Sequence, residues 1–381
     1  MFILVNINSM NVIIIFTYGI SMKAWDYSGI LEREVEIYKR LQENHGVKFT
    51  FITFGDEEDE EYSYLFNNFK IIPIYKYLKK SNSKIIDVIK TSLVFLKFKN
   101  VLPKKAIIKT NQLNGAWLGI FMKIFLKYPL YLRTGYNLFA FSVKNKKKFL
   151  VKVFHYCLTQ ICLFIADVYS VTSNVDRNYL ESKFLNSNKI IVVPNWVIDI
   201  RENSFENRLS NRVLSVGRLE MQKNYFALIK SFSKADVGLD IVGEGSLKLS
   251  LIQEAINFET DLHLLGKLDH NDLNQKYLNY RIFISPSFFE GNPKVVLEAM
   301  SKGVLVVARK NENIMEIIKH NVNGILYDDR DNLNQIVSKL LTDKALIEKL
   351  VTKAYTEIRE INHIDVVINK ELEIYKKISN G

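Results

Sequence analysis

Short runs of apolar, β-branched residues alternate along the chain with longer segments in which apolar residues recur at helical spacing. This alternation is typical of a parallel sheet whose two faces are covered by helices. In the first half of the chain, the pattern predicts strands over residues 12–16, 48–54, 106–109, 130–133, 168–171 and 190–193. It predicts a helix over residues 30–41, and we expect the acidic run at residues 56–61 to be a solvated loop.

The pattern restarts after Pro194 and a polar stretch at residues 201–211, which is the best domain boundary in the sequence. The second half predicts strands over residues 212–216, 238–242, 262–265, 282–285 and 304–308. Two helical stretches are expected after Asp331, the last over residues 365–378. The predicted fold is therefore α/β, with two Rossmann-like, doubly wound domains facing a central cleft. We expect the domains to cover residues 1–194 and 195–362, with a C-terminal helix at 363–381 packing back toward the first domain.

The apolar amino terminus resembles a signal peptide, but it has no early Lys or Arg and no small-residue cleavage site before Tyr18. A buried first strand fits it better. The longest candidate for a membrane span, residues 156–168, is shorter than the roughly 18–20 apolar residues that a span requires. We expect a cytoplasmic chain, with peripheral attachment at the inner face of the cytoplasmic membrane as a further option.

The composition is that of a globular protein, with 48% hydrophobic and 24% charged residues among 381. The net charge of +11 suggests an anionic partner. In residues 144–154, lysines are followed by apolar residues, which suits either a helix lying on an anionic bilayer or a solvated basic face beside a buried helix. The two cysteines are too few for a disulfide framework, and the six histidines are not spaced as metal ligands are. We therefore expect neither a disulfide framework nor a metal site.

Two cations follow a predicted buried strand in the second half. The sequence runs Val216-Gly217-Arg218-Leu219, and Lys223-Asn224 comes shortly after. A diphosphate that leaves a sugar needs cations on its oxygens, and an Arg fork with a Lys point charge supplies them. Surface Arg and Lys after a strand are also common in proteins that bind no phosphate, so this element alone is only suggestive.

A second element joins a strand to a helix through a loop that carries a carboxylate, Glu290, beside Gly291. We expect Asn292 to be the N-cap and Pro293 the first helical residue, which leaves free backbone amides for a phosphate or a sugar oxygen. Glu298 lies on the helix eight residues after Glu290. One carboxylate can face sugar hydroxyls while the other accepts hydrogen bonds from a ribose diol.

These two elements resemble those of the retaining glycosyltransferases of family four (group 1), which have the GT-B fold. Four further motifs agree in order and spacing: Val193-Pro194-Asn195, Val242-Gly243-Glu244-Gly245, Leu265-Gly266, and the Asn323-Gly324-Ile325-Leu326 that follows Glu316-Ile317-Ile318. The resemblance covers about residues 190–330, and it extends to the first half only through the pattern of elements.

The resemblance implies that Arg218 and Lys223 hold the donor diphosphate, that Glu290 lies at the donor sugar and that Glu298 binds the ribose. It implies donor contacts at a further set of residues: Gly217, Asn224, Gly243, Gly266, Gly291, Asn292, Pro293 and Lys294. It also implies retention of anomeric configuration, no cofactor or metal, and a nucleoside-diphosphate sugar donor, with UDP favoured over GDP. The expected acceptor is a saccharide or a lipid-linked saccharide in bacterial surface polysaccharide biosynthesis, such as capsule or lipopolysaccharide.

The sequence departs from the family pattern in two places. The double glycine that often precedes Glu316 is absent, and residues 310–315 read Lys-Asn-Glu-Asn-Ile-Met. The amino-terminal glycine pair is matched only in part by Gly19 and Gly29, which could equally be ordinary turn residues. Gly19, Gly29 and Arg133 are the acceptor-site candidates.

Two other classes of protein share parts of this pattern. Gly243-Glu244-Gly245 starts like a dinucleotide fingerprint, but Lys248 stands where the third glycine of a dehydrogenase would be. The alternative from another class is a catalytically inactive module of the same fold that binds a membrane or nucleic acid. Such a protein would be expected to lose one of Arg218, Lys223, Glu290 and Glu298, and all four are present. We therefore expect no nucleic-acid partner.

Overall fold

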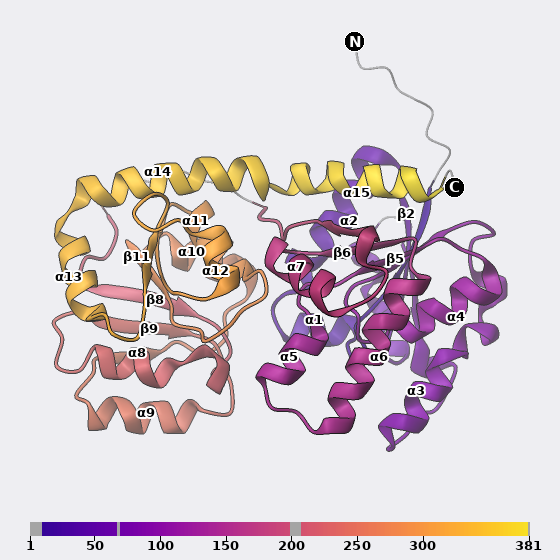
Figure 1. Ribbon diagram of the computed structural model, residues 1–381, viewed down its shortest axis with the longest axis horizontal. Helices are drawn as coiled ribbons and strands as arrows, with labels where there is room; N and C mark the ends of the chain where they lie inside the picture. Colours follow the sequence, from indigo (N-terminus) through magenta and orange to yellow (C-terminus); the bar gives the residue numbers. More distant parts are fainter. Residues whose placement is uncertain (1–9, 67–68, 199–206, 380–381) are drawn as a thin grey trace, which may run out of the picture. The chain divides into compact units, whose positions relative to one another are not determined.

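The computed structural model describes residues 10–66, 69–198 and 207–379 (Figure 1). It divides into two compact units, one formed by Met1–Val193 with Ile368–Gly381 and the other by Pro194–Val367. Each unit contains one parallel sheet with helices packed against it. The predicted pair of Rossmann-like α/β domains is confirmed.

The sheet of the first unit has the strand order β3-β2-β1-β4-β5-β6-β7, and its recorded pairs are parallel. The strands are β1 Asn11–Ile15, β2 Lys48–Thr53, β3 Lys70–Pro73, β4 Ile107–Thr110, β5 Leu130–Arg133, β6 Val168–Val171 and β7 Ile190–Val192. All but β3 were predicted to within two residues. The apolar run of β1 lies at the centre of the sheet and is buried on both faces, as expected for a parallel sheet.

Helices cover both faces of this sheet. They are α1 Met22–Tyr27, α2 Leu31–His45, α3 Lys84–Ser92, α4 Ala116–Leu126, α5 Leu138–Lys144, α6 Phe149–Ile165, α7 Asn174–Lys183 and α15 Ile364–Ser379, of which residues from Ile368 onward belong to this unit. Consecutive residues of β4 point to the two faces. Ile108 packs toward Gly119 of α4, whereas Lys109 forms a buried ion pair with Glu371 of α15. Short 3₁₀ segments lie between the elements: η1 Glu57–Leu65, η2 Ile74–Lys76, η3 Val94–Lys97, η4 Lys99–Val101 and η5 Ser187–Lys189.

Two local predictions for this unit are wrong. The acidic run is exposed for most of its length, as expected, but it forms the start of η1 rather than a loop, and Asp59 turns inward and is almost fully buried. Its carboxylate accepts hydrogen bonds from the Thr53 hydroxyl and from the Lys23 amide, which replace its lost hydration. Residues 144–154 do not form one helix either. They comprise the end of α5, an exposed turn in which Lys146 has φ of 50°, and the start of α6.

The sheet of the second unit has the order β10-β9-β8-β11-β12-β13, again with parallel pairs. The strands are β8 Arg212–Val216, β9 Gly238–Val242, β10 Leu262–Leu264, β11 Ile282–Ser285, β12 Leu305–Arg309 and β13 Ile325–Tyr327. The helical segments are η6 Met221–Lys223, α8 Tyr225–Ser231, α9 Lys248–Asn257, α10 His270–Tyr277, α11 Lys294–Ser301, α12 Glu312–Ile317, α13 Leu333–Thr342 and α14 Lys344–Ile361. Three helices thus follow Asp331 where two were expected.

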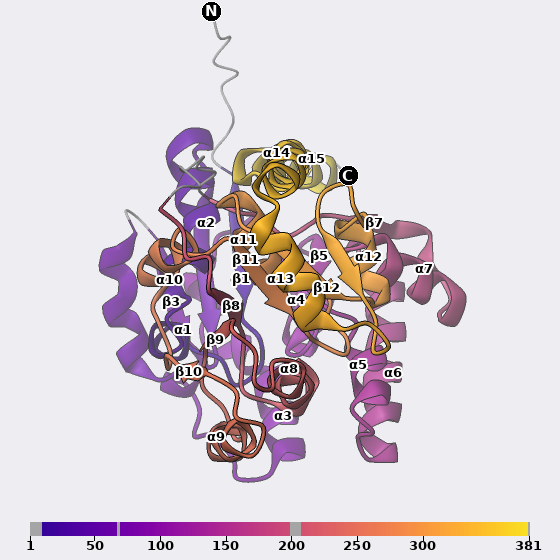
Figure 2. The same cartoon turned by 90° about the vertical axis from the view of Figure 1, so that its left-hand side faces the viewer.

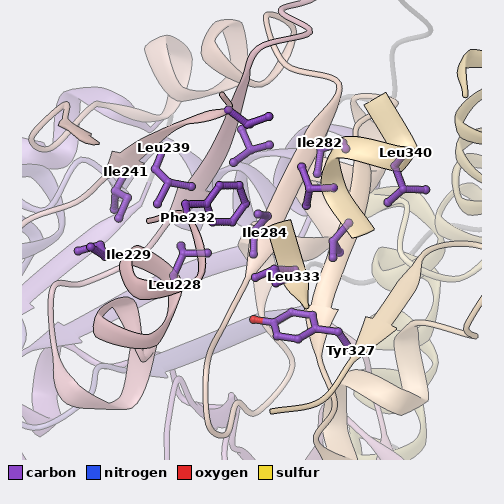
Figure 3. Packing of buried hydrophobic residues seen from close by; sticks show 14 of the residues in the cluster. Leu228, Ile229, Phe232, Leu239, Ile241, Ile282, Ile284, Tyr327, Leu333 and Leu340 are labelled. Carbon is purple, nitrogen blue, oxygen red and sulfur yellow. The ribbon is translucent and has the colours of Figure 1, made fainter. Parts of the chain in front are cut away.

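The core of the second unit lies on both sides of its sheet. On one side, Ile282 and Ile284 of β11 pack with Phe232, which follows α8, and with Leu333 of α13 (Figure 3). Phe283, which lies between the two isoleucines, belongs to the apolar cluster on the other side. Successive side chains of a strand point to opposite faces of the sheet. Because both faces are covered here, every residue of the apolar run is buried. Among the described residues, no helix is both long and apolar enough to cross a bilayer.

Candidate functional site

The candidate site lies in the second unit, where the loops after β8 and β11 meet. These strands are neighbours in the sheet, and the chain order runs outward from them in opposite directions, through β9 and β10 on one side and β12 and β13 on the other. In an open parallel sheet, the carboxyl edge at such a change of direction is a ligand-binding position. Arg218 and Lys223 follow β8, and Glu290 follows β11.

An ion pair joins the two loops, because the Lys223 Nζ lies 2.6 Å from the Glu290 Oε1. Both side chains are largely buried. An ammonium and a carboxylate at this distance form a charge-assisted hydrogen bond. The structure therefore brings together two of the three predicted catalytic side chains.

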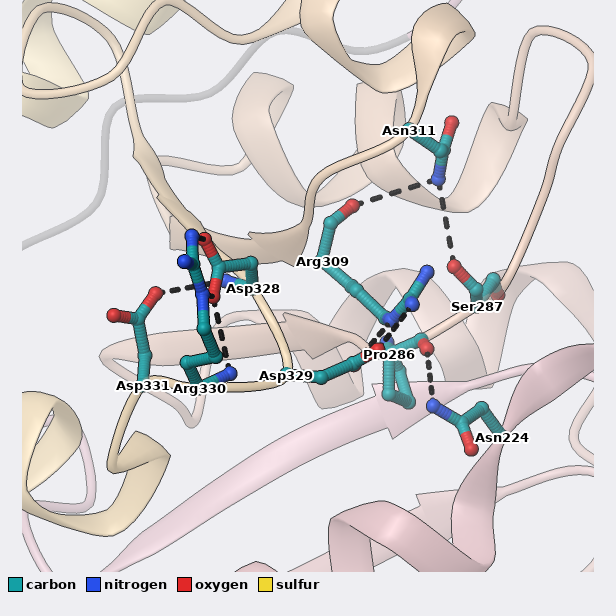
Figure 4. A network of polar contacts seen from close by, with 9 residues as sticks. All are labelled: Asn224, Pro286, Ser287, Arg309, Asn311, Asp328, Asp329, Arg330 and Asp331. Carbon is teal, nitrogen blue, oxygen red and sulfur yellow. Dashed lines mark hydrogen bonds and ion pairs between the residues drawn. The ribbon is translucent and has the colours of Figure 1, made fainter.

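The residues on either side of Lys223 strengthen this connection. The Gln222 side chain donates to the Phe289 carbonyl at 2.8 Å, and the Phe288 amide donates to the Gln222 carbonyl at 3.0 Å. The Asn224 Nδ2 donates to the Pro286 carbonyl at 3.2 Å (Figure 4). The sequence reasoning missed Gln222, whose only signal was its position beside Lys223.

Arg218 differs from Lys223 in being exposed. Within residues 10–66, 69–198 and 207–379, its guanidinium has no ion pair and no side-chain hydrogen bond. Gly217 lies between this arginine and the strand, and a Cβ there would come within 2.9 Å of the Lys223 Cε. The glycine thus leaves room for the lysine side chain to pass beside the backbone and reach Glu290.

Gly243 and Gly266 lie where the loops after β9 and β10 pack near the loop after β8. Gly243 has φ of 147°, and a Cβ there would lie 2.0 Å from the Gly217 carbonyl oxygen. Its amide donates to the Gly266 carbonyl at 2.7 Å. Only glycine permits so close a backbone approach. Packing between the loops explains Gly243, and its predicted contact with the donor stays a prediction.

The start of α11 differs from the expectation. The helix begins at Lys294 with Pro293 as its N-cap, and no side chain caps it. The Asn292 side chain instead accepts from the Asn195 amide at 3.4 Å, and the Asn195 Nδ2 donates to the Asn292 carbonyl at 2.6 Å. The predictions of Asn292 as N-cap and Pro293 as first helical residue are therefore wrong. A partner 97 residues away takes the place of the local capping bond.

The boundary segment makes a second contact with this helix start. The Lys294 Nζ lies 4.1 Å from the centroid of the Trp196 ring, which is a cation–π geometry. Gly291 and Pro293 are buried between these contacts. The predicted donor contacts at residues 291–294 remain predictions. Residues 291–293 lie in the loop directly after Glu290, and Lys294 is the first residue of α11.

Glu298 is buried on α11, about one turn after the helix begins at Lys294. The Tyr277 hydroxyl donates to the Glu298 Oε2 at 3.4 Å and to the Val295 carbonyl at 3.2 Å. A buried carboxylate with a hydroxyl partner is fixed in position. Its assignment to a ribose stays a prediction.

The loop after β12 contacts the same region from the other side (Figure 4). The Arg309 guanidinium lies 5.2 Å from the centroid of the Phe288 ring and pairs with both carboxylate oxygens of Asp329 at 2.6–2.7 Å. Asn311 caps α12 and its amide reaches the Ser287 carbonyl at 3.4 Å. The residues that replace the family's double glycine region therefore support the Glu290 loop.

The acceptor candidates lie in the first unit. Gly19 and Gly29 both have positive φ, of 78° and 67°, and Gly19 is exposed, with no atom within 4 Å of the position that a Cβ would take. Arg133 is 5% exposed. Burial lowers the pKa of Lys109, and the charge of Arg133 lowers it further, so Arg133 lies near the buried Lys109–Glu371 pair. The acceptor roles of all three stay predictions.

No group of three or more His, Cys, Asp or Glu side chains is arranged to hold a metal ion among the described residues. Cys157 is exposed and Cys162 buried, and both are free thiols. Burial raises the pKa of the Cys162 thiol well above its usual range, which makes it unreactive.

Part of the second unit matches a known protein family. Residues 198–357 match the family described as "Glycosyl transferases group 1". The chain is 27% identical over 333 residues to the Escherichia coli UDP-Gal:alpha-D-GlcNAc-diphosphoundecaprenol alpha-1,3-galactosyltransferase, covering 75% of this chain and 82% of that protein. It is 32% identical over 163 residues to a Campylobacter jejuni N-acetylgalactosaminyltransferase named for a diphospho-undecaprenol acceptor, covering 40% and 44%.

The chain spans about half the length of the first curated relatives it matches, between 44% and 59%. Among solved structures, Anabaena HepE in complex with UDP and glucose matches with a TM-score of 0.75 at 16% identity, over 97% of this chain and 100% of that one. At this identity the likeness shows the fold alone, two Rossmann-like domains of the GT-B type.

Proposed function

We propose that this chain, which has the GT-B fold and matches the group 1 glycosyltransferases over residues 198–357, transfers a sugar from a nucleoside-diphosphate sugar to a saccharide or lipid-linked acceptor. The observation that carries the proposal is the Lys223–Glu290 ion pair between the loops after β8 and β11, with Arg218 exposed in the first of these loops. A diphosphate gathers negative charge as the glycosidic bond breaks. Fixed cations aimed at its oxygens stabilise that charge in the transition state.

In this proposal the two cations have different tasks. Arg218 is exposed, so its planar fork can take two phosphate oxygens at once. Lys223 has three N–H groups, of which one is used by Glu290, so the others can donate to the diphosphate without breaking the ion pair. The pair thus orients the lysine before the donor arrives.

Glu290 would then lie beside the donor sugar, and Glu298 would accept from the ribose. We propose that the reaction retains the anomeric configuration, with the departing diphosphate held on the same face as the incoming acceptor. The two-carboxylate scheme of glycosidases is not needed, because a nucleoside diphosphate is already a good leaving group. No cofactor or metal is required, since Arg218 and Lys223 supply the positive charge.

The names of the relatives support the choice of substrates. The E. coli relative is named for UDP-Gal and, like that of Campylobacter, for a diphosphoundecaprenol-linked acceptor. The Anabaena neighbour binds UDP. We therefore favour a UDP-sugar donor and a lipid-linked acceptor in the assembly of a bacterial surface polysaccharide.

The test is a panel of nucleotides and nucleotide sugars against the purified chain. A ligand bound only by the folded state, at a hundred times its Kd, should add about 2.7 kcal/mol to stability and raise the melting temperature. We expect UDP and one UDP-sugar to do so and Arg218→Ala to abolish the effect. If no nucleotide stabilises the chain and no sugar is transferred to a lipid-linked saccharide, the proposal fails.

A further inference from the structure

Helix α3 in the first unit has its polar side inward and its apolar side outward. Its buried residues are Asp87, Thr91 and Ser92. Ile85 and Ile89, one turn apart, are 74% and 64% exposed. A surface helix of a globular protein ordinarily buries its apolar stripe. This helix therefore presents a stripe that some other apolar phase would have to cover.

Buried hydrogen bonds hold α3 in this orientation. The Asp87 carboxylate accepts from the Tyr18 hydroxyl at 3.0 Å, the Tyr75 hydroxyl at 2.6 Å and the Ser81 amide at 2.8 Å. The Thr91 hydroxyl accepts from the Trp117 indole at 3.2 Å. Turning the isoleucines inward would leave a buried carboxylate and an indole N–H without partners, which is costly. The outward stripe is thus built into the unit.

The start of α6 adds a second apolar group. Phe149 and Leu150 are 76% and 79% exposed, and Phe154 of the next turn is half exposed. The Trp117 ring of α4 contacts Phe154 while its indole N–H bonds to Thr91, so α4 connects α3 to α6. Figures 1 and 2 both show α3 and the first turn of α6 at the lower end of this unit. We call Ile85, Ile89, Phe149 and Leu150 the apolar face.

The surroundings of the apolar face are positively charged. Residues 62–166 contain nineteen Lys and Arg but a single acidic residue, Asp87, which is fully buried. Lys84 and Lys90 flank the stripe on α3, and residues 146–148 are three exposed lysines directly before Phe149. The exposed lysines next to Ile85, Ile89, Phe149 and Leu150 in the sequence therefore have no exposed carboxylate among their neighbours within this stretch.

We propose that α3 and the first turn of α6 bind the surface of an anionic phospholipid bilayer. The apolar face would enter the boundary of the acyl chains while the lysines stay at the level of the phosphates. A nucleic acid would explain the charge but not four large apolar side chains held in water. It would also favour arginine for planar phosphate recognition, and the one arginine of residues 62–166, Arg133, is buried. This surface is independent of the proposed transfer reaction.

The test is flotation of the full chain with phospholipid vesicles, without donor or acceptor. We expect binding to vesicles that mix phosphatidylcholine with phosphatidylglycerol, weaker binding to phosphatidylcholine alone, and loss of binding as salt rises. Ile85→Ser with Ile89→Ser, and separately Phe149→Ser with Leu150→Ser, should each lower the partition coefficient about tenfold or more. The matched control is Leu249→Ser with Ile256→Ser on α9, whose side chains are 80% and 65% exposed; it should bind as the original chain does.

Three outcomes would overturn the proposal. They are equal binding to neutral and anionic vesicles, no binding to either, and binding that neither double variant weakens. Binding of duplex DNA at the same salt concentration tests the alternative that the lysines bind nucleic acid. Tight DNA binding that survives both serine variants, together with no vesicle binding, would assign the lysines to nucleic acid. Because no nucleotide sugar is present, failure here leaves the transfer proposal standing.

Discussion

Lys223 and Glu290 form an ion pair, with 2.6 Å between Nζ and Oε1, although 67 residues separate them in the sequence. The pair joins the loops that follow two neighbouring strands, β8 and β11. One contact therefore positions both the cation that we propose for the diphosphate and the carboxylate that we propose for the sugar. The predictions for the transfer reaction follow from this relationship and from the exposed Arg218 beside it.

Replacing Arg218 with alanine should weaken nucleoside-diphosphate binding and turnover together. The guanidinium is free to form two hydrogen bonds with a diphosphate, and losing them should cost about 2–4 kcal/mol. Isothermal calorimetry with UDP and the steady-state rate measure the two effects. Arg359→Ala, an exposed arginine on α14, is the control and should change neither. Unchanged UDP affinity in Arg218→Ala would remove Arg218 from the diphosphate site.

Replacing Glu290 with glutamine should affect the rate more than the binding of nucleotide. A group that interacts most strongly as the glycosidic bond breaks appears in the turnover rate, so we expect a loss of about a hundredfold or more. Affinity for the free nucleoside diphosphate should change by less than about threefold.

Glu298→Ala should show the opposite emphasis, with weaker nucleotide binding as its main effect. Its carboxylate is buried on α11 and assigned to the ribose. Rates at saturating donor and calorimetric affinities separate the two carboxylates. Near-normal turnover in Glu290→Gln would mean that another group acts at the donor sugar.

Gly243→Ala should destabilise the second unit. The new methyl group would lie 2.0 Å from the Gly217 carbonyl oxygen at a φ of 147°. Overpacking and backbone strain together should cost about 2–5 kcal/mol. Gly19→Ala is the control, because its φ of 78° is also positive but no atom lies within 4 Å. Its cost should be limited to about 1–2 kcal/mol of backbone strain. Urea unfolding compares the two, and equal losses would contradict the packing explanation.

Removing Glu371 should destabilise the first unit through Lys109. Both side chains are almost fully buried, and their charged groups lie 2.7 Å apart. Glu371→Leu leaves a buried ammonium without its partner, which should cost about 3–5 kcal/mol. The double variant Lys109→Met with Glu371→Leu removes both charges and should be more stable than Glu371→Leu alone. If urea unfolding shows the double variant to be less stable than Glu371→Leu, the loss of stability comes from the missing ion pair rather than from the unpaired buried charge.

Acid should weaken the anchoring of α3 through Asp87. Burial alone would raise the pKa of this carboxyl, but hydrogen bonds from the Ser81 amide, Tyr75 and Tyr18 outweigh it and lower the pKa. A lowered folded-state pKa means that the stabilisation is fully present above the unfolded value of about 3.9 and is lost as pH falls through the folded value. The melting temperature should therefore fall more steeply below about pH 4 in the original chain than in Asp87→Asn. Parallel curves for the two chains would exclude this contribution.

The sequence by itself determined the elements whose signal is local. Apolar β-branched runs such as 282–285 give strands because every residue of a central parallel strand is buried, and β11 begins and ends where the run does. The order of the glycine, arginine and glutamate motifs was enough to indicate the family. Two strands of the sheets, β3 and β13, were not predicted from the sequence.

The tertiary structure decided which side chains meet and which way they face. Asp59 lies in a run typical of solvated acids, yet Thr53 and Lys23 satisfy it in a buried position, and Asn292 is bonded to Asn195 rather than to its own helix. Helix α3 has its apolar stripe outward because Asp87 and Thr91 find buried partners on other elements. In each case the partner that decides the orientation is distant in the sequence or lies on another element. A hydrogen bond to a buried group is worth more than the local propensity it overrides, and only the folded chain brings that partner within reach.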